Sequence, residues 1–141
     1  MDWLERVRSL LDAPSPATLT TYRADGSALV TPVWFRFEDG ALEVVIAEGD
    51  VKLRNLERDP RCSLLVFETV PPFRGIEVAG TPELIAGDVA EARATIAGRY
   101  LGAAGGERFA RTRKKPGVLL RLRAERPRVW DLASILPTDG S

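Results

Sequence analysis

Two Asp-Gly steps, Asp25-Gly26 and Asp39-Gly40, constrain the fold of this chain more than any other feature of its sequence. Each step stands between runs of apolar and β-branched residues, and glycine readily takes the positive φ angle that a tight turn requires. The pattern predicts three strands, over residues 17–22, 28–37 and 41–47. Consecutive strands joined by such turns pair antiparallel, so this part of the chain is expected to form a β-meander.

The rest of the chain continues this pattern with short helices between strands. Apolar residues at helical spacing predict a helix over residues 2–12, and Asp50 and Pro60 bracket a second helix. A capping box at Asp88 and Glu91 predicts the start of a third, with Val89, Ala92, Ile96 and Tyr100 on its inner face. Further strands are predicted at residues 61–67, 73–85, 118–124 and 128–132, and a short helix at 107–112.

Proline and glycine indicate where these elements are interrupted. A bulge or a sheet edge is expected at Pro32, inside the second predicted strand. The same is expected at Gly80 and Pro82, inside the predicted strand 73–85. A flexible link is predicted at Gly102, Gly105 and Gly106, and a loose tail is predicted at residues 137–141.

These elements together predict one mainly β domain over residues 1–141, with an N-terminal helix within residues 1–14. Six to seven mostly antiparallel strands with short helices favour a closed β-barrel whose ends the helices cover.

Composition excludes several classes of function. The chain has no histidine and one cysteine, Cys62, which removes Ser-His and Cys-His nucleophile pairs, most zinc sites and an internal disulfide. Twenty basic residues balance twenty acidic ones, whereas a general nucleic-acid binder carries a basic surplus. No apolar run is long enough to span a membrane, and the start does not resemble a signal peptide, so a cytoplasmic protein is expected. A chain this poor in catalytic groups either binds ligands or takes its chemistry from a cofactor.

The densest candidate site is the segment from Ile46 to Arg61. A strand ends, Gly49 permits a tight approach, and a helix begins with Lys52 and Arg54 in its first turn. Free N–H groups and two cations at a helix start suit an anion such as a cofactor phosphate. An ordinary capped amphipathic helix with solvated bases explains the same pattern equally well.

Two further segments are candidates. Thr31-Pro32-Val33-Trp34-Phe35 disturbs its strand at the proline, which can leave backbone groups to read the edge of a flat heterocycle; an edge strand with core aromatics is the simpler interpretation. The loop from Phe67 to Gly75 joins an aromatic residue and Arg74, which suits an anionic substrate or a rigid surface loop. Trp130 could cap a site or lie in the core.

Three stretches together resemble one family. Residues 19–26, the run Val30-Thr31-Pro32-Val33-Trp34-Phe35, and the run from Lys52 to Arg61 with its Arg-Asn-Leu-x-Arg-Asp-Pro-Arg string are similar to the pyridoxamine 5'-phosphate oxidase-like flavin/deazaflavin oxidoreductases. Pro72-Phe73-Arg74 followed by Ile76-Glu77-Val78-Ala79-Gly80 resembles the branch that uses coenzyme F420.

The resemblance implies an FMN-binding-like split β-barrel homodimer with cofactor sites at the subunit interface. It implies a phosphate near Lys52, with Arg54 and Asn55 close by, and a ring along residues 31–34. The cofactor-binding residues expected on this basis are Thr31, Pro32, Val33, Trp34, Ala47, Glu48, Gly49, Lys52, Arg54 and Asn55. Phe73, Arg74 and Trp130 are the substrate candidates, no residue is assigned a catalytic role, and no metal is expected.

One position departs from the family pattern. Asp50 stands where family members often carry Arg or Ser, and an aspartate there competes for the same N–H groups and repels a phosphate.

The leading hypothesis is hydride transfer between F420 and a small conjugated substrate. An FMN-dependent enzyme of the same fold is the alternative. A third class is a non-catalytic protein that binds F420, FMN, haem or a lipid-like ligand, with the lack of histidine against ordinary histidine-ligated haem.

Overall fold

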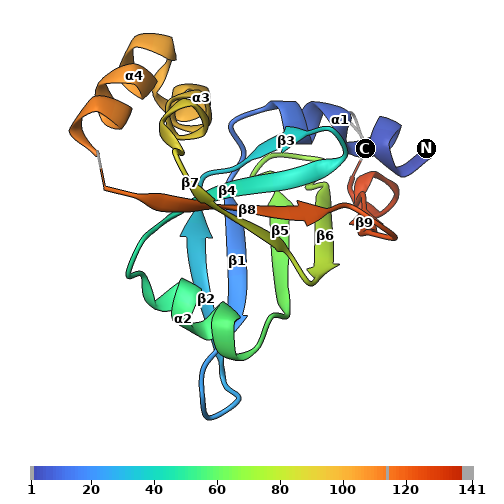
Figure 1. Cartoon of the computed structure of the whole chain (residues 1–141). Coiled ribbons are helices and arrows are strands. Elements are labelled where there is room, and N and C mark those ends of the chain that lie inside the picture. Colours follow the sequence, from blue (N-terminus) through green and yellow to red (C-terminus); the bar gives the residue numbers. More distant parts are fainter. Residues whose placement is uncertain (1, 114, 138–141) are drawn as a thin grey trace.

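The computed structural model describes residues 2–113 and 115–137 (Figure 1). Within them, four α-helices and nine strands form two antiparallel sheets. The helices are α1 (Asp2–Asp12), α2 (Val51–Arg58), α3 (Ala90–Leu101) and α4 (Ala103–Thr112), with a 3-10 turn at Ala133–Ile135. The strands are β1 (Ala17–Tyr22), β2 (Ala28–Val33), β3 (Arg36–Glu38), β4 (Ala41–Ala47), β5 (Cys62–Phe67), β6 (Gly75–Gly80), β7 (Glu83–Gly87), β8 (Gly117–Arg123) and β9 (Arg128–Trp130).

The first sheet has the strand order β2-β1-β5-β6-β9, and the second has the order β3-β4-β8-β7. The strands of the second sheet run across those of the first (Figure 1). Alternate residues of both sheets point into the space between them, because successive side chains of a strand face opposite ways. Leu19, Leu64 and Ile76 from the first sheet and Leu120 from the second are fully buried there.

The mainly β, antiparallel architecture is confirmed, but the closed barrel is not. No ladder joins the two sheets among the described residues. The structure has nine strands among the described residues rather than six to seven. The difference arises because two segments, each predicted as a single strand, form two strands that belong to different sheets. Residues 28–37 divide at Trp34-Phe35 into β2 and β3, and residues 73–85 divide at Thr81-Pro82 into β6 and β7. Pro82 cannot donate to a ladder, which fits a break at that point.

The first two helices agree with the sequence prediction. Val7, Leu10 and Leu11 of α1 are buried in the core cluster. The N-cap of α2 is Asp50, and Leu53 and Leu56 on its inner face are buried. Both helices therefore form because an apolar stripe can be covered by the sheets.

The third and fourth helices form a hairpin, and here the prediction of a flexible link is wrong. Gly105 and Gly106 lie inside α4, which begins at Ala103. A Cβ on Gly106 would lie 2.5 Å from the carbonyl oxygen of Ala94 and from the backbone nitrogen of Gly98. Glycine is therefore used for close helix packing at this position. The predicted capping box is also only half formed: Asp88 Oδ1 accepts from the Ala90 N–H at 2.9 Å, whereas Glu91 pairs with Arg36 at 3.3 Å.

Residues 138–141 of the predicted tail lie outside the described residues.

Candidate functional site

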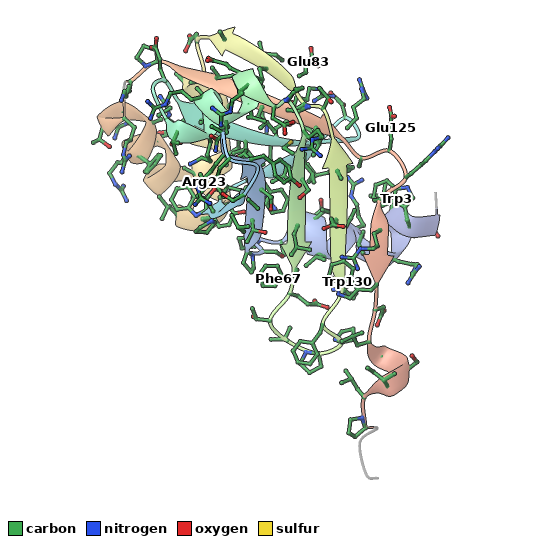
Figure 2. The ribbon with its side chains drawn as sticks, turned by 90° about the horizontal axis from the view of Figure 1, so that it is seen from below. Trp3, Arg23, Phe67, Glu83, Glu125 and Trp130 are labelled. Atoms are coloured by element: carbon green, nitrogen blue, oxygen red, sulfur yellow. The ribbon has the colours of Figure 1, made fainter. Side chains whose placement is uncertain are left out.

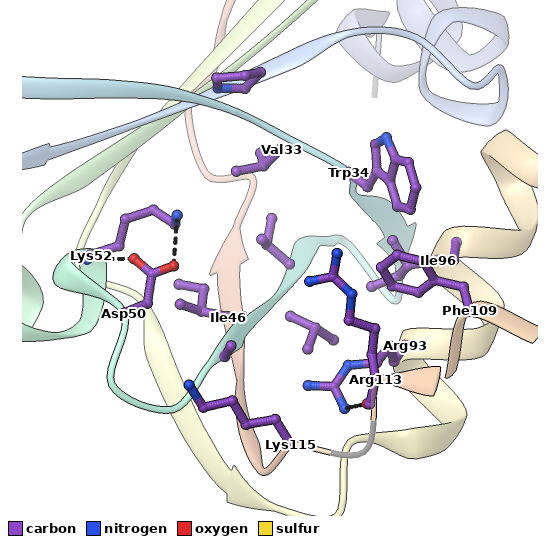
Figure 3. A pocket seen from close by; sticks show the side chains of 15 residues that line it. Val33, Trp34, Ile46, Asp50, Lys52, Arg93, Ile96, Phe109, Arg113 and Lys115 are labelled. Carbon is purple, nitrogen blue, oxygen red and sulfur yellow. Dashed lines mark hydrogen bonds and ion pairs between the residues drawn. The ribbon is translucent and has the colours of Figure 1, made fainter. Parts of the chain in front are cut away.

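A pocket of about 270 Å³ opens between the end of β2, the strand β4 and the α3–α4 hairpin (Figure 3). Both sheets and the hairpin contribute residues to the pocket. β2 ends beside it at Val33, and β4 ends beside it at Ala47. The lining residues are Pro32, Val33, Trp34, Val44, Val45, Ile46, Ala47, Asp50, Lys52, Arg93, Ile96, Ala97, Phe109, Arg113 and Lys115.

The floor of the pocket is apolar. Val44 and Ile46 come from β4, and Ile96 and Ala97 come from the inner face of α3. All four are buried. The floor therefore belongs to the protein core and is fixed by its packing.

Aromatic rings form one wall of the pocket. The indole of Trp34 stacks on Tyr100 with ring centroids 5.2 Å apart and an interplanar angle of 12°. Phe109 of α4 lies 5.2 Å from the same indole at 55°. Trp34 keeps 37% of its surface exposed. Such a wall suits the face of a flat, apolar ring.

The break between β2 and β3 that carries Trp34 is held by side chains of α3. The Phe35 N–H donates to the Tyr100 hydroxyl at 3.3 Å, and that hydroxyl donates to the Ser15 carbonyl oxygen at 3.2 Å. Burial raises the pKa of Tyr100, which keeps this donor protonated. Arg99 donates to the carbonyl oxygens of Phe35, Leu11 and Ala13.

These contacts affect one sequence interpretation. Both backbone groups of Phe35 are bound by side chains, so they are not free to read a heterocycle. β2 is nevertheless the edge strand of its sheet, and Thr31 Oγ1 on it is a buried hydroxyl without a hydrogen-bond partner among the described residues. Thr31 shares its strand face with Val33, which lines the pocket.

The start of α2 lies on one side of the pocket, and its lysine and aspartate are paired with each other. Asp50 Oδ1 accepts from the Lys52 N–H at 2.9 Å, and Asp50 Oδ2 contacts the Lys52 ammonium at 3.1 Å. Burial opposes the ionisation of Asp50, but the hydrogen bonds from Lys52 and the charges of Lys52 and Arg54 outweigh it and lower the pKa of Asp50. The aspartate thus occupies both the helix N–H and the lysine that the sequence assigned to a phosphate.

Three cations that the sequence reasoning missed lie on the other side. Arg93 of α3 is 9% exposed, and its Nη1 donates to the Arg113 carbonyl oxygen at 2.6 Å. The Arg113 guanidinium lies 5.2 Å from the Phe109 ring centroid. Figure 3 shows Arg93, Arg113 and Lys115 reaching into the pocket from this side, with Asp50 and Lys52 across from them.

Signals for these residues were present in the sequence. Arg93 is four residues after Val89 and three before Ile96, so it interrupts the apolar face of its helix with a charge. Arg113 and Lys115 stand immediately before the strand that begins at Gly117. A buried position for an arginine is rare without a partner, which makes such an interruption informative.

The structure brings half of the predicted cofactor residues together. Pro32, Val33, Trp34, Ala47 and Lys52 line the pocket. Thr31 lies beside them on β2. Glu48, Gly49 and Arg54 are exposed near the start of α2 without lining the pocket.

Asn55 has a structural role at its position on α2. It is 3% exposed, donates from Nδ2 to Thr21 Oγ1 at 3.1 Å, and accepts from Arg58 at 3.0 Å. These contacts tie α2 to β1, and the assignment of Asn55 to a cofactor stays a prediction.

The three substrate candidates are not part of this pocket. Arg74 makes a two-pronged contact with Glu68 at 2.9 and 3.0 Å and donates to Ser9 Oγ at 2.9 Å, so it fixes its loop to α1. Trp130 ends β9 (Figure 2), where Arg128 covers its ring at 4.7 Å. Phe73 precedes Arg74 in the same loop, with a positive φ of 57°. A role for these residues in substrate binding stays a prediction.

The described residues that line the pocket include no thiol or hydroxyl nucleophile and form no metal centre. Cys62 is buried on β5, and burial raises the pKa of its thiol to about 12, in agreement with a small core residue. Within residues 2–113 and 115–137, no group of three metal-ligating side chains occurs. No helix in the same part of the chain has the length and apolar character to cross a membrane.

Solved structures share this fold. A conserved hypothetical protein from Mycobacterium tuberculosis is 26% identical, with a TM-score of 0.76 over 97% of this chain and 90% of that one. An F420 reductase is 24% identical, with a TM-score of 0.70 over 86% of this chain and 94% of that one. A heme storage protein from Vibrio cholerae is 16% identical, with a TM-score of 0.66 over 93% and 95% of the two chains. No curated protein matches the sequence.

The sequence itself settles the family. Residues 4–131 match the family described as pyridoxamine 5'-phosphate oxidase, which covers nearly the whole chain. The chain belongs to this family, as the resemblance of its motifs predicted.

Proposed function

We propose that the pocket holds a flat heterocyclic cofactor with an anionic tail, and that the protein transfers a hydride between this cofactor and a small conjugated organic substrate. Coenzyme F420 is the cofactor we propose, with FMN as the alternative. The proposal is supported by family membership and by the F420 reductase among the similar structures.

One observation carries the proposal: an apolar floor, an aromatic wall and several cations meet in a single pocket. A tricyclic ring needs the first two, and a phosphate or carboxylate tail needs the third. The buried hydroxyl of Thr31, which has no partner among the described residues, supports a polar ligand beside β2.

The cofactor supplies the hydride chemistry when it is bound. The chain's own residues bind and orient. Trp34 and Phe109 present ring faces to the ligand, and Val44 and Ile46 exclude water from beneath it. No side chain needs to act as a nucleophile, which is consistent with a chain that lacks histidine.

The binding part is tested by titrating the full-length protein with F420 and with FMN while cofactor fluorescence is followed. Trp34→Leu is expected to weaken binding roughly tenfold, because a stacking surface is lost. Trp3→Leu is the matched control, since Trp3 packs on the core from α1. Absence of binding for both cofactors, or equal affinities for the two variants, would contradict the proposal.

Turnover is tested separately, by following oxidation of the reduced cofactor in the presence of an enone acceptor. A non-catalytic cofactor carrier is the second candidate, favoured by the absence of an unpaired carboxylate among the described residues that line the pocket, where Asp50 is the one carboxylate and is paired with Lys52. The similar structure of a heme storage protein supports the same candidate. Binding without oxidation would favour it over the reductase.

We further propose that the protein is a homodimer with the pocket near the subunit interface. The exposed apolar residues Val30 and Trp34, on and just beyond the edge strand β2, support an interface there. Light scattering coupled to size-exclusion chromatography tests it, and a monomer at high concentration would contradict it.

A further inference from the structure

We propose that Arg93, Arg113 and Lys115 form the anion-binding site of the pocket and hold the phosphate of the ligand, in place of the start of α2. The inference rests on the proposed function, because it names the part of the same pocket that receives the anionic end. It departs from the expectation that the phosphate sits at Lys52.

The first argument is the unbalanced charge of this side. No carboxylate lies within 4.0 Å of the basic groups of Arg93, Arg113 or Lys115 among the residues that the structure describes. The three cations line the same pocket and reach into it from this side (Figure 3). An anion bound there is attracted by all three charges.

The second argument is the burial of Arg93. Arg93 is nine-tenths buried. Within the described residues it makes one hydrogen bond, which Nη1 donates to the Arg113 carbonyl oxygen. A guanidinium has five N–H donors. Arg93 lines the pocket, so its remaining donors are available to an oxyanion there.

The third argument is the effect of Arg93 on the end of α4. The Arg113 carbonyl belongs to the C-cap of that helix, where the helix dipole is negative and repels anions. Because Arg93 binds this carbonyl, the positive charge of the guanidinium offsets the unfavourable end of the dipole. The C-terminus of α4 can therefore lie beside a bound phosphate.

The fourth argument is the space that Gly117 leaves. A Cβ at this position would lie 3.0 Å from Arg93 Nη2, from the Ile46 carbonyl oxygen and from Val89 Cγ2. A side chain here would crowd the guanidinium of Arg93 as well as the backbone of β4. The sequence thus accommodates the buried arginine at the strand that follows Lys115.

The start of α2 is the competing location, and it is occupied. Asp50 already takes the Lys52 N–H and the Lys52 ammonium. A phosphate there would have to displace a carboxylate from both groups or approach it closely. The other side of the pocket carries three positive charges, from Arg93, Arg113 and Lys115. A phosphate there would meet more positive charge, and no carboxylate among the described residues would compete with it.

The test uses inorganic pyrophosphate as the probe, so that it does not depend on the cofactor. Calorimetric titration of the full-length protein is expected to show binding that Arg93→Gln weakens by roughly tenfold or more. The double variant Arg113→Gln/Lys115→Gln is expected to show a comparable loss, and it avoids the folding risk of Arg93 because both residues are exposed. Arg93→Lys should restore part of the affinity.

Two further variants complete the test. Arg111→Gln is the matched control, since Arg111 is exposed on α4 and does not line the pocket. Lys52→Gln distinguishes the two sides, and we expect a smaller loss than for Arg93→Gln. No binding of pyrophosphate by the unaltered protein, or a greater loss in Lys52→Gln than in the Arg113→Gln/Lys115→Gln variant, would overturn the proposal.

A comparison of FMN with riboflavin then links the site to the cofactor, because the two differ only by the phosphate. If the protein prefers FMN, the preference should disappear in Arg113→Gln/Lys115→Gln and persist in Arg111→Gln. A preference that persists in the double variant would overturn the proposal. If pyrophosphate binds through Arg93 while FMN and F420 both fail to bind, the anion site stands and the proposed function fails.

Discussion

The two cationic sides of the pocket contain similar residues but differ in how their charges are used. At the start of α2, Lys52 is paired with Asp50 at 3.1 Å, and the same aspartate caps the helix. On the α3–α4 side, Arg93 binds a backbone carbonyl, and no carboxylate among the described residues pairs with it. Lys52 is neutralised within the protein, whereas the three cations of the other side have no carboxylate partner among the described residues.

The difference shows why a motif alone does not locate an anion site. A helix start with two bases is a good candidate because free N–H groups point outward from it. A single acidic residue at the N-cap position removes that advantage. The charge that remains available depends on side chains from other elements, and these become visible only in three dimensions. Three substitutions and one series of pH values test the comparison between the two sides.

Arg99→Gln should have the largest effect, because Arg99 fixes the side that carries the free charge. It donates to the carbonyl oxygens of Phe35, Leu11 and Ala13, and its guanidinium lies 4.5 Å from the Phe35 ring centroid. Leaving buried carbonyls without donors should lower the free energy of unfolding by about 3 kcal/mol. Urea denaturation measures it, with exposed Arg108→Gln as the control; equal midpoints for the two variants would show that α3 is held mainly by apolar packing.

Gly106→Ala should have the next largest effect. The added Cβ would meet backbone atoms of Ala94 and Gly98 at 2.5 Å, so α4 must move away from α3. Overpacking of this kind typically costs about 1–3 kcal/mol, and the shift should also displace Phe109 and Arg113 from the pocket. Thermal unfolding and FMN titration measure the two effects. Ala104→Ser is the control on the exposed face of α4, and an unchanged melting temperature for Gly106→Ala would contradict the close packing of the hairpin.

Asp50→Asn should sharpen the comparison by giving charge back to the α2 side. Asparagine keeps the N-cap hydrogen bond, so the helix start is preserved while Lys52 loses its ionic partner. We expect pyrophosphate to bind more tightly by about 1 kcal/mol, roughly fivefold. Asp59→Asn is the control at the other end of the helix, where Asp59 contacts Arg61 at 2.7 Å. A gain in both variants would indicate a general charge effect rather than a local one.

The sequence predicted the elements whose signals are local. The helix at residues 2–12 and the strands at 17–22 and 41–47 match the structure, because apolar spacing and Asp-Gly turns act over a few residues. It failed where tertiary contacts decide. The break after Val33 is stabilised by Tyr100 and Arg99 from a distant helix, and Gly106 became helical because α3 packs against it. Neither contact can be read from neighbouring residues.

The candidate site follows the same division. Residues 32–34, Ala47 and Lys52, which the family resemblance assigned to the cofactor, lie around one pocket, and their role in binding stays a prediction. Arg93, Arg113 and Lys115 were missed because their local signals, a charge on an apolar helix face and two bases shortly before a strand, do not show that these residues meet at one pocket. Asn55 was assigned to the cofactor from its place in a motif; its buried amide donates to Thr21, and the cofactor role stays a prediction. A motif fixes which residue types are present, and the fold decides what each side chain contacts.

The pH dependence of stability should give the smallest effect and test the neutralised side directly. The pKa of Asp50 lies below its ordinary value in the folded state, so its ionised form stabilises the protein at pH values above about 4 and this contribution is lost as the pH falls through the lowered pKa. The stability difference between the unaltered protein and Asp50→Asn should therefore shrink as the pH falls from 6 toward about 3. Urea denaturation at each pH measures the difference.

Asp88→Asn serves as the control, because Asp88 also accepts a backbone N–H at a helix start, at 2.9 Å from Ala90. If the difference for Asp50→Asn does not change with pH, the contact between Asp50 and Lys52 is too weak to neutralise that side, and the start of α2 regains its place as a competitor for the phosphate.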